Sequence, residues 1–254
     1  MELKRVVVTG IGAITPLGHN VPDTWKALIN GESGSDLISH FDTTNFKTKF
    51  ACEIKNYDAA NYFDRKESRK MDRFAQYAMI SAEEALKDSN IDLESVDLHR
   101  MGVILASGIG GVETLLNEIK GFIEGNGIPR FSPFFIPKII CDIAAGLISM
   151  KYGLKGPNYA TVSACASSTN AIIDSVQLIR NQKADIIIAG GSEAAINEVG
   201  MGGFNSMQAI STKNDEYKTA SRPFCATRDG FVMGEGSAVL ILEEYEHAKA
   251  RGAK

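Results

Sequence analysis

The chain has 254 residues, of which 44% are hydrophobic and 23% are charged, a composition typical of a globular protein with a full core. Its 27 basic and 31 acidic side chains give a net charge of −4, which argues against binding nucleic acid or an anionic membrane through overall charge. No apolar run approaches the roughly 20 residues of a membrane-spanning helix, and the N-terminus has no signal-peptide core, so we expect a cytoplasmic protein.

In chain order, the first part of the sequence predicts a strand, a glycine-rich turn and two helices. The strand is 6–10, with three consecutive valines, and the turn runs through 10–18. A short helix is expected at 23–30, followed by irregular structure to residue 64. Residues 71–89 repeat apolar side chains at helical spacing and predict a strong amphipathic helix.

The second part alternates apolar strands with helices. Strands are expected at 102–108, 159–164, 185–190 and 237–244, helices at 113–124, 138–152, 167–182 and 245–251, and loops at 125–137 and 200–228. Continuous Val, Ile and Ala strands between helices are typical of an α/β protein with a layered, mainly parallel sheet. No linker rich in Pro, Gly or Ser divides the chain into two domains.

The turn at 10–18 offers one hypothesis about function. Gly10 and Gly12 follow a strand, as in a dinucleotide-binding turn. The third glycine of that pattern is replaced by Thr15, and Pro16 stands where the phosphate-binding helix should run. A nicotinamide-dependent oxidoreductase is therefore only the rival interpretation, and a structural glycine turn is favoured.

Cys165 is the stronger candidate. It lies between the strand expected at 159–164 and the helix expected at 167–182, among small residues, in the manner of a nucleophile elbow. A thiol at a helix N-terminus is favoured as thiolate, and the backbone N–H groups there can stabilise an oxyanion. Packing remains the interpretation for the other cysteines, Cys52, Cys141 and Cys225. The cysteines and histidines are too scattered for a zinc site, and no disulfide is expected.

A third feature is the basic segment 65–70, the densest positive cluster of an acidic chain. It is either a solvated helix start or a docking patch for an anionic partner, which Arg130 could extend.

Several motifs, in order and at matching spacing, give the chain a family resemblance. They lie at 5–12, 15–18, 65–72, 107–111, 132–137, 164–165, 189–193, 222–224 and 228–236. With these motifs the chain resembles the β-ketoacyl-[acyl-carrier-protein] synthases of the thiolase superfamily, and most of all the type II elongating enzyme of bacterial fatty acid synthesis. The resemblance implies a thiolase-like α/β fold, no cofactor, no metal and a homodimer.

The resemblance also implies roles for individual residues. Cys165 would accept an acyl chain from acyl carrier protein, and condensation with malonyl carrier protein would then give a β-ketoacyl product two carbons longer. Ile109 would gate the acyl pocket, Phe204 would form an apolar wall, and Phe134 would close the far end, often from the partner subunit. The carrier protein would dock on four basic residues: Lys66, Arg69, Lys70 and Arg130.

In this family the α/β unit is repeated, and the second unit supplies two histidines, a lysine and another oxyanion donor. The histidines of this chain do not lie in the corresponding motifs. We therefore interpret residues 1–254 as the N-terminal unit, which carries the nucleophile, and expect the C-terminal unit to be absent. Three further alternatives remain: a polyketide-type ketosynthase, a catalytically idle module that only docks carrier protein, and a chain-length-factor-like partner, against which Cys165 argues.

Overall fold

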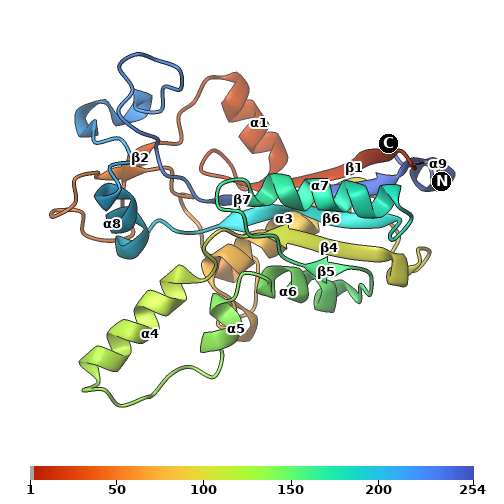
Figure 1. Ribbon diagram of the computed structural model, residues 1–254, viewed down its shortest axis with the longest axis horizontal. Coiled ribbons are helices and arrows are strands. Elements are labelled where there is room, and N and C mark those ends of the chain that lie inside the picture. The colour runs from red at the N-terminus through yellow and green to blue at the C-terminus, as the bar shows by residue number, and fades with distance from the viewer. Residues whose placement is uncertain (1–2) are drawn as a thin grey trace.

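The computed structural model describes residues 3–254 as one central sheet with helices on both faces and long excursions at one end (Figure 1). The strands are β1 (Val6–Ile14), β2 (Asp36–Leu37), β3 (Phe50–Ala51), β4 (Met101–Ala106), β5 (Asn158–Tyr159), β6 (Ile186–Glu193) and β7 (Gly236–Glu244). The α-helices are α1 (Val21–Ile29), α2 (Arg65–Ser68), α3 (Arg73–Ser89), α4 (Val112–Glu124), α5 (Phe135–Ile139), α6 (Ile143–Tyr152), α7 (Ser167–Arg180), α8 (Glu198–Ser206) and α9 (Tyr245–Ala250). Short 3₁₀ turns are η1 (Ala59–Asn61), η2 (Leu98–Arg100) and η3 (Asn214–Thr219).

The main sheet has five strands in the order β1-β7-β6-β4-β5. β4 is parallel to both β5 and β6, whereas β7 is antiparallel to both β6 and β1. Four strands therefore run in one direction and only β7 opposes them, which confirms the layered, mainly parallel α/β sheet. Within residues 3–254 no helix is long and apolar enough to cross a bilayer.

The sheet carries a helical layer on each face, because its strands are apolar on both sides. Val103 and Leu105 belong to the core cluster under α3 and α6, whereas Ile104 and Ala106 belong to the cluster under α7. Figure 1 shows α7 in front of the sheet and α3 and α6 behind it, with α4 and α5 projecting away from the sheet. The carboxyl ends of β4 and β6 therefore lie beside the start of α7.

The glycine-rich turn expected at 10–18 is wrong for its first half, because β1 continues to Ile14 and pairs with β7. The glycines serve packing: a Cβ on Gly12 would lie 1.9 Å from the carbonyl oxygen of Ser81, and one on Gly10 would lie 2.3 Å from that of Ala85. Gly10 and Gly12 thus let α3 lie directly on the strand. A glycine pair inside a paired strand cannot form a dinucleotide-binding turn, which removes the structural basis for the oxidoreductase interpretation.

Three other expectations need correction. The strand expected at 159–164 is only the short β5, and its later residues are partly or fully exposed. The helix expected at 138–152 is divided into α5 and α6, and the loop expected at 200–228 contains part of α8 and η3. The amphipathic helix begins at Arg73 because Asp72 caps it.

Candidate active site

Cys165 lies at a sharp turn between β5 and α7. The preceding residue, Ala164, has a φ of +52°, a left-handed conformation that costs a residue with a side chain roughly 1–2 kcal/mol. The turn is closed by hydrogen bonds from the N–H of Ala166 to the carbonyl of Ser163 (3.2 Å) and from the N–H of Ser167 to that of Ala164 (3.1 Å). The thiol is thereby presented at the surface, and Cys165 is exposed.

Hydroxyl and amide side chains hold this turn in place. The Ser167 hydroxyl donates to the carbonyl of Ala164 (2.6 Å) and accepts from the N–H of Ser163 (2.8 Å). Asn170 donates to the Ser163 hydroxyl (2.6 Å), and Thr161 donates to the carbonyl of Ser167 (2.8 Å). No side chain caps the N-terminus of α7. The N–H of Ser167 is bonded to Ala164 and that of Asn170 to Ala166, but those of Ser168 and Thr169 can serve a carbonyl oxygen that becomes negatively charged when the sulfur attacks it.

Gly191 sets how closely α7 approaches the sheet. A Cβ at this position of β6 would lie 1.9 Å from the Ser168 hydroxyl and 3.0 Å from its Cβ. The first turn of α7 is therefore seated directly on β6, two residues before that strand ends at Glu193.

The loop with Ile109 lies against the same turn. A Cβ on Gly108 would be 3.5 Å from the carbonyl oxygen of Ala164, and Ile109 itself is 43% exposed. The Glu193 carboxylate accepts the N–H of Gly108 (2.7 Å) and of Ile109 (3.1 Å) and the Ser107 hydroxyl (3.1 Å). Burial raises the pKa of Glu193, although these hydrogen bonds oppose the rise. The structure thus places Gly108, which precedes Ile109, against the Cys165 turn and adds Glu193, while the role of Ile109 as gate stays a prediction.

Sequence reasoning does not single out Glu193, although the residue belongs to the motif at 189–193. The available signal is an acidic residue that ends an otherwise apolar, fully buried strand. Such a carboxylate needs hydrogen-bond donors, and the glycine-rich end of the neighbouring strand is where free backbone N–H groups are found.

The basic residues and Phe134 are partly brought together. Lys66, Arg69 and Lys70 are all exposed, in α2 and directly after it. The Lys70 ammonium lies 5.9 Å from the centre of the Phe134 ring, which precedes α5. Arg130 is exposed on the loop between α4 and α5.

Phe204 lies in α8, in a different apolar cluster. Its ring meets that of Phe231 edge-on at 5.5 Å, and Phe204 packs against a cluster that includes Met201. The structure shows no contact between Phe204 and the Cys165 turn within residues 3–254, so its role as pocket wall stays a prediction.

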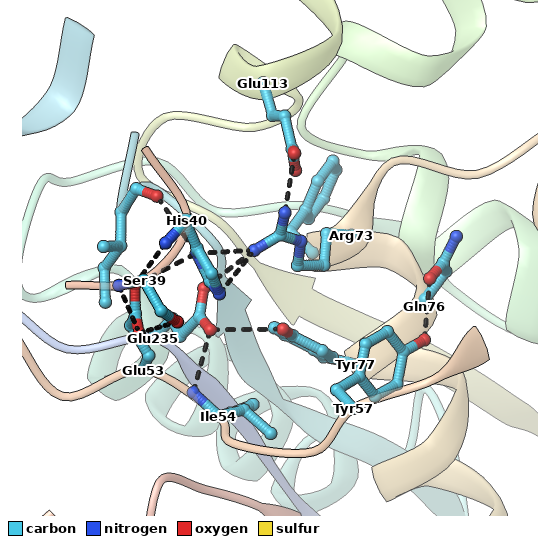
Figure 2. A network of polar contacts seen from close by, with 12 residues as sticks. Ser39, His40, Glu53, Ile54, Tyr57, Arg73, Gln76, Tyr77, Glu113 and Glu235 are labelled. Carbon is cyan, nitrogen blue, oxygen red and sulfur yellow. Dashed lines mark hydrogen bonds and ion pairs between the residues drawn. The ribbon is translucent and has the colours of Figure 1, made fainter. Parts of the chain in front are cut away.

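A partly buried polar network lies at the start of α4 (Figure 2). Arg73 donates to Glu113 of α4 (2.6 Å) and to a ring nitrogen of His40 (2.9 Å), and it lies 3.8 Å from the buried Glu235. Burial raises the pKa of Glu235, which accepts hydrogen bonds from the N–H of Ile54 (2.9 Å) and the Tyr77 hydroxyl (3.3 Å). The network joins α3 and α4 to the segment between β2 and η1, which contributes His40 and Ile54.

Three of the four histidines form hydrogen bonds elsewhere, and the fourth, His99, lies in η2. His19 bonds to the Lys55 carbonyl (2.8 Å), His40 to Arg73, and His247 to Glu243 (2.6 Å). None of these hydrogen bonds places an imidazole beside Cys165, so the site described by residues 3–254 offers backbone donors rather than an acid–base pair.

The other thiols differ from one another. Burial raises the pKa of Cys52 and of Cys141, and for Cys141 the nearby Glu193 carboxylate adds to the rise. Cys225 does not pack in the core as expected: a hydrogen bond with the Thr227 hydroxyl (3.3 Å) holds the pKa of its thiol below the ordinary value. Cys225 is therefore the main chemical competitor of Cys165.

Hollows on the surface do not single out Cys165. One of about 790 Å³ is formed by the loop 221–231, with Arg222, Arg228 and Phe224 among its walls. Another, of about 290 Å³, lies between α3 and α4 and is lined by Asp72, Arg73 and Glu113. Cys165 lines neither of these two hollows, and the candidate site is defined by its chemistry.

Residues 3–248 match the model of the β-ketoacyl synthase N-terminal domain. The chain belongs to the β-ketoacyl synthase family. It is 46% identical over all 254 residues to the 3-oxoacyl-[acyl-carrier-protein] synthase 2 of Vibrio cholerae serotype O1, and 46% identical over 250 residues to the enzyme of the same name from Staphylococcus aureus strain COL. It covers 61% and 60% of the lengths of these relatives, respectively.

Solved structures agree on this ketosynthase fold. A β-ketoacyl synthase from Burkholderia phymatum STM815 superposes with a TM-score of 0.89 at 35% identity, covering 99% of this chain and 62% of that one. A type II polyketide ketosynthase, solved in complex with its acyl-carrier protein and bound to the hexaketide, gives 0.88 at 31% identity, covering 100% and 61%. The thiolase-like fold expected from the motifs is confirmed.

Proposed function

We propose that this chain is the nucleophile-bearing part of an elongating β-ketoacyl-[acyl-carrier-protein] synthase of fatty acid biosynthesis. The observation that carries the proposal is Cys165, exposed on a strained turn at the uncapped start of α7 in a chain of this family. The curated relatives named 3-oxoacyl-[acyl-carrier-protein] synthase 2 support this specific activity.

In the proposed reaction the Cys165 sulfur attacks the thioester carbonyl of an acyl carrier protein. The bond from that carbonyl to the carrier's sulfur breaks, and the carrier leaves as a free thiol with the proton of Cys165. The oxyanion of the tetrahedral intermediate is stabilised by backbone N–H groups at the start of α7. Malonyl carrier protein then loses carbon dioxide, and its carbanion attacks the acyl-Cys165 carbonyl, which releases the cysteine sulfur.

The second step needs groups that the described residues do not place at Cys165. We propose that residues 1–254 form one unit of the enzyme and that histidines from a second unit, as implied by the family, complete it. The curated relatives are long enough for such a unit, since this chain spans about 60% of their length. Two exposed apolar side chains, Val162 before α7 and Ile173 in the middle of that helix, support a packing surface there.

Acyl carrier protein is the proposed partner, and the exposed basic residues of 66–70 are its proposed docking surface. A polyketide ketosynthase of similar fold has been solved with its acyl-carrier protein. Charge reversal of Lys66, Arg69 and Lys70 together should weaken carrier binding at least tenfold at low salt, because each lost attraction lowers association and affinity. The matched control is Lys183→Glu, an exposed lysine in the turn before β6. Unchanged affinity in the triple variant would contradict this surface.

A homodimer is also proposed, and the apolar surface of α4 and α5 supports it. Phe122, Phe131 and Phe135 stack at centre distances of 5.5 and 5.3 Å. Around them, large apolar side chains are exposed: Leu115, Ile119, Ile123, Ile128, Phe134 and Ile136. A patch of this kind marks an interface, and a second copy would bring Phe134 to the partner's pocket as the family implies.

A polyketide ketosynthase is the second candidate, favoured by the fold match to such an enzyme at a TM-score of 0.88. The two differ in the chain they accept: fatty acid elongation uses saturated acyl groups and polyketide extension uses β-ketoacyl groups. Faster transfer of saturated than of β-keto thioesters to Cys165 would support the fatty acid function, and the reverse order would support the alternative. The cytoplasmic location remains a prediction from the sequence.

A further inference from the structure

Residues 107–110 form the Ile109 loop, and hydrogen bonds arrange them around the carboxylate of Glu193. Glu193 accepts the N–H groups of Gly108 and Ile109 on one oxygen and the Ser107 hydroxyl on the other. The Ser107 hydroxyl in turn accepts the N–H of Gly110 (3.0 Å). Each of residues 107–110 is therefore tied to Glu193 directly or through one hydroxyl.

The loop is shaped to fit this carboxylate closely. A Cβ on Gly108 would lie 3.1 Å from a Glu193 oxygen and 3.5 Å from the Ala164 carbonyl oxygen, so the loop is held between Glu193 and the Cys165 turn. Gly110 has a φ of +73°, and a Cβ there would lie 2.6 Å from the Ile139 carbonyl oxygen. Glycine at both positions allows the backbone to wrap around the acid.

Glu193 also ends the strand that seats the nucleophile's helix. Gly191 of β6 receives the first turn of α7 through Ser168, and Glu193, two residues later on the same strand, receives the Ile109 loop. The end of β6 therefore positions the nucleophile and the proposed gate relative to each other. Within residues 3–254 Glu193 forms no ion pair, so backbone and hydroxyl donors are the groups that satisfy its carboxylate.

We propose that Glu193 is a positioning residue that fixes the Ile109 loop against the Cys165 turn and thereby sets which acyl chain lengths reach Cys165. The inference rests on the proposed function, because it takes Ile109 as the gate of the acyl pocket. A carboxylate suits this task because both of its oxygens accept hydrogen bonds, whereas a neutral amide has one accepting oxygen and an apolar side chain has none.

The test measures acylation of Cys165 by hexanoyl, decanoyl and hexadecanoyl pantetheine thioesters, followed by mass spectrometry of the intact protein. Glu193→Gln keeps the size of the side chain but places an NH₂ group against N–H or O–H donors. It should reduce the spread of rate constants between chain lengths by roughly tenfold, because a released loop discriminates less. Alkylation of Cys165 by iodoacetamide should remain unchanged, and Cys52 and Cys141 should react no faster than in the parent, whereas a general loss of structure would expose both of these thiols.

The matched control is Glu198→Gln, the same change on an exposed glutamate of α8 that pairs with Lys120 (2.7 Å) and does not touch the loop. Ser107→Ala provides a second variant if Glu193→Gln does not fold, since it removes one direct bond to Glu193 and the support of Gly110. Either loop variant should reduce the difference in acylation rate constant between chain lengths, whereas Glu198→Gln should leave this difference as in the parent.

Ile109→Ala distinguishes the role of Ile109 as gate from the role of Glu193 in positioning it. Ile109→Ala could change the dependence of acylation on chain length while Glu193→Gln and Ser107→Ala leave this dependence unchanged. That result would overturn the positioning role of Glu193 but support Ile109 as the gate. If Ile109→Ala leaves the profile unchanged too, the assignment of Ile109 fails and this inference fails with it, whereas acylation at Cys165 still supports the proposed function.

Discussion

The absent side chain of Gly191 decides how the nucleophile's helix meets the sheet. The Ser168 hydroxyl occupies the space that a methyl group on Gly191 would take, at 1.9 Å. The position of Cys165, three residues before Ser168, therefore depends on a glycine in the neighbouring strand. A thiol on a turn that is held by residues in adjacent elements keeps a constant geometry, which a nucleophile requires.

Gly191→Ala is expected to displace the first turn of α7. Overpacking of this kind costs about 1–3 kcal/mol in unfolding free energy, and acylation of Cys165 should slow at least tenfold because the turn moves with the helix. Urea denaturation and acylation kinetics measure the two effects.

The control is Gly121→Ala, in α4, where a Cβ meets nothing within 4 Å. It should raise stability by about 0.5–1 kcal/mol, since alanine favours a helix over glycine, and leave acylation unchanged. A Gly191→Ala protein as stable and as reactive as the parent would contradict the seating of α7 on β6.

At the scale of elements, β1, β7 and α9 are joined by a buried acid. Glu243 of β7 is fully buried and accepts hydrogen bonds from Arg251 (2.7 Å), His247 (2.6 Å) and Thr9 (2.8 Å). Burial on its own would raise the pKa of Glu243, but these donors together hold the pKa below the ordinary value of 4.5. The folded protein therefore takes up this proton less readily than the unfolded chain does.

Because folding lowers its pKa, Glu243 contributes fully to the free energy of unfolding above the ordinary pKa of a glutamate. This contribution is lost as the pH falls through the lower pKa of the folded state. Arg251→Met removes the strongest partner and should lower the unfolding free energy at neutral pH by about 2–4 kcal/mol, because it leaves a buried charge poorly compensated. The difference from the parent should shrink in acid.

Lys254→Met is the matched control, since the Lys254–Asp88 pair is exposed and exposed pairs contribute about 0–1 kcal/mol. Chemical denaturation across the acid range measures all three proteins. A destabilisation by Arg251→Met that stays constant with pH would show that the account of Glu243 is wrong.

Apolar periodicity predicted most of the elements correctly, and the errors have physical causes. The glycines at 10 and 12 suggested a turn, yet they lie in β1 because α3 needs space there, a long-range contact that local spacing does not reveal. The segment 159–164 carries strand-forming residues but leaves the sheet after Tyr159 to form the Cys165 turn. Local sequence does not indicate the role of Glu193, because its donors lie in the loop after β4, 84 to 86 residues away in sequence.

At the scale of the whole molecule, two exposed regions differ from the average surface: the basic segment 65–70 and the apolar face of α4 and α5. The net charge of −4 does not reveal the basic segment, and the overall composition does not reveal the exposed apolar face of α4 and α5. The apolar face is exposed because α4 and α5 project from the sheet in Figure 1, which composition alone does not show.

Ile123→Glu tests the proposed homodimer. Ile123 is 68% exposed on α4, and a buried, unpaired glutamate at an interface should shift a dimer to monomers at micromolar concentration. Ile29→Glu is the control, since Ile29 is 65% exposed on α1, away from that face. Light scattering after size exclusion measures the mass. A parent protein that is monomeric, or a dimer indifferent to Ile123→Glu, would contradict this interface.

The most direct test of the central claim is to locate the acyl group after reaction with a long-chain acyl carrier protein. The protein is digested and the modified peptide is identified by mass spectrometry, with Cys165→Ala and Cys225→Ala as a matched pair of variants. We predict the acyl group on Cys165, its loss in Cys165→Ala and its retention in Cys225→Ala. An acyl group found mainly on Cys225, or undiminished in Cys165→Ala, would contradict the account.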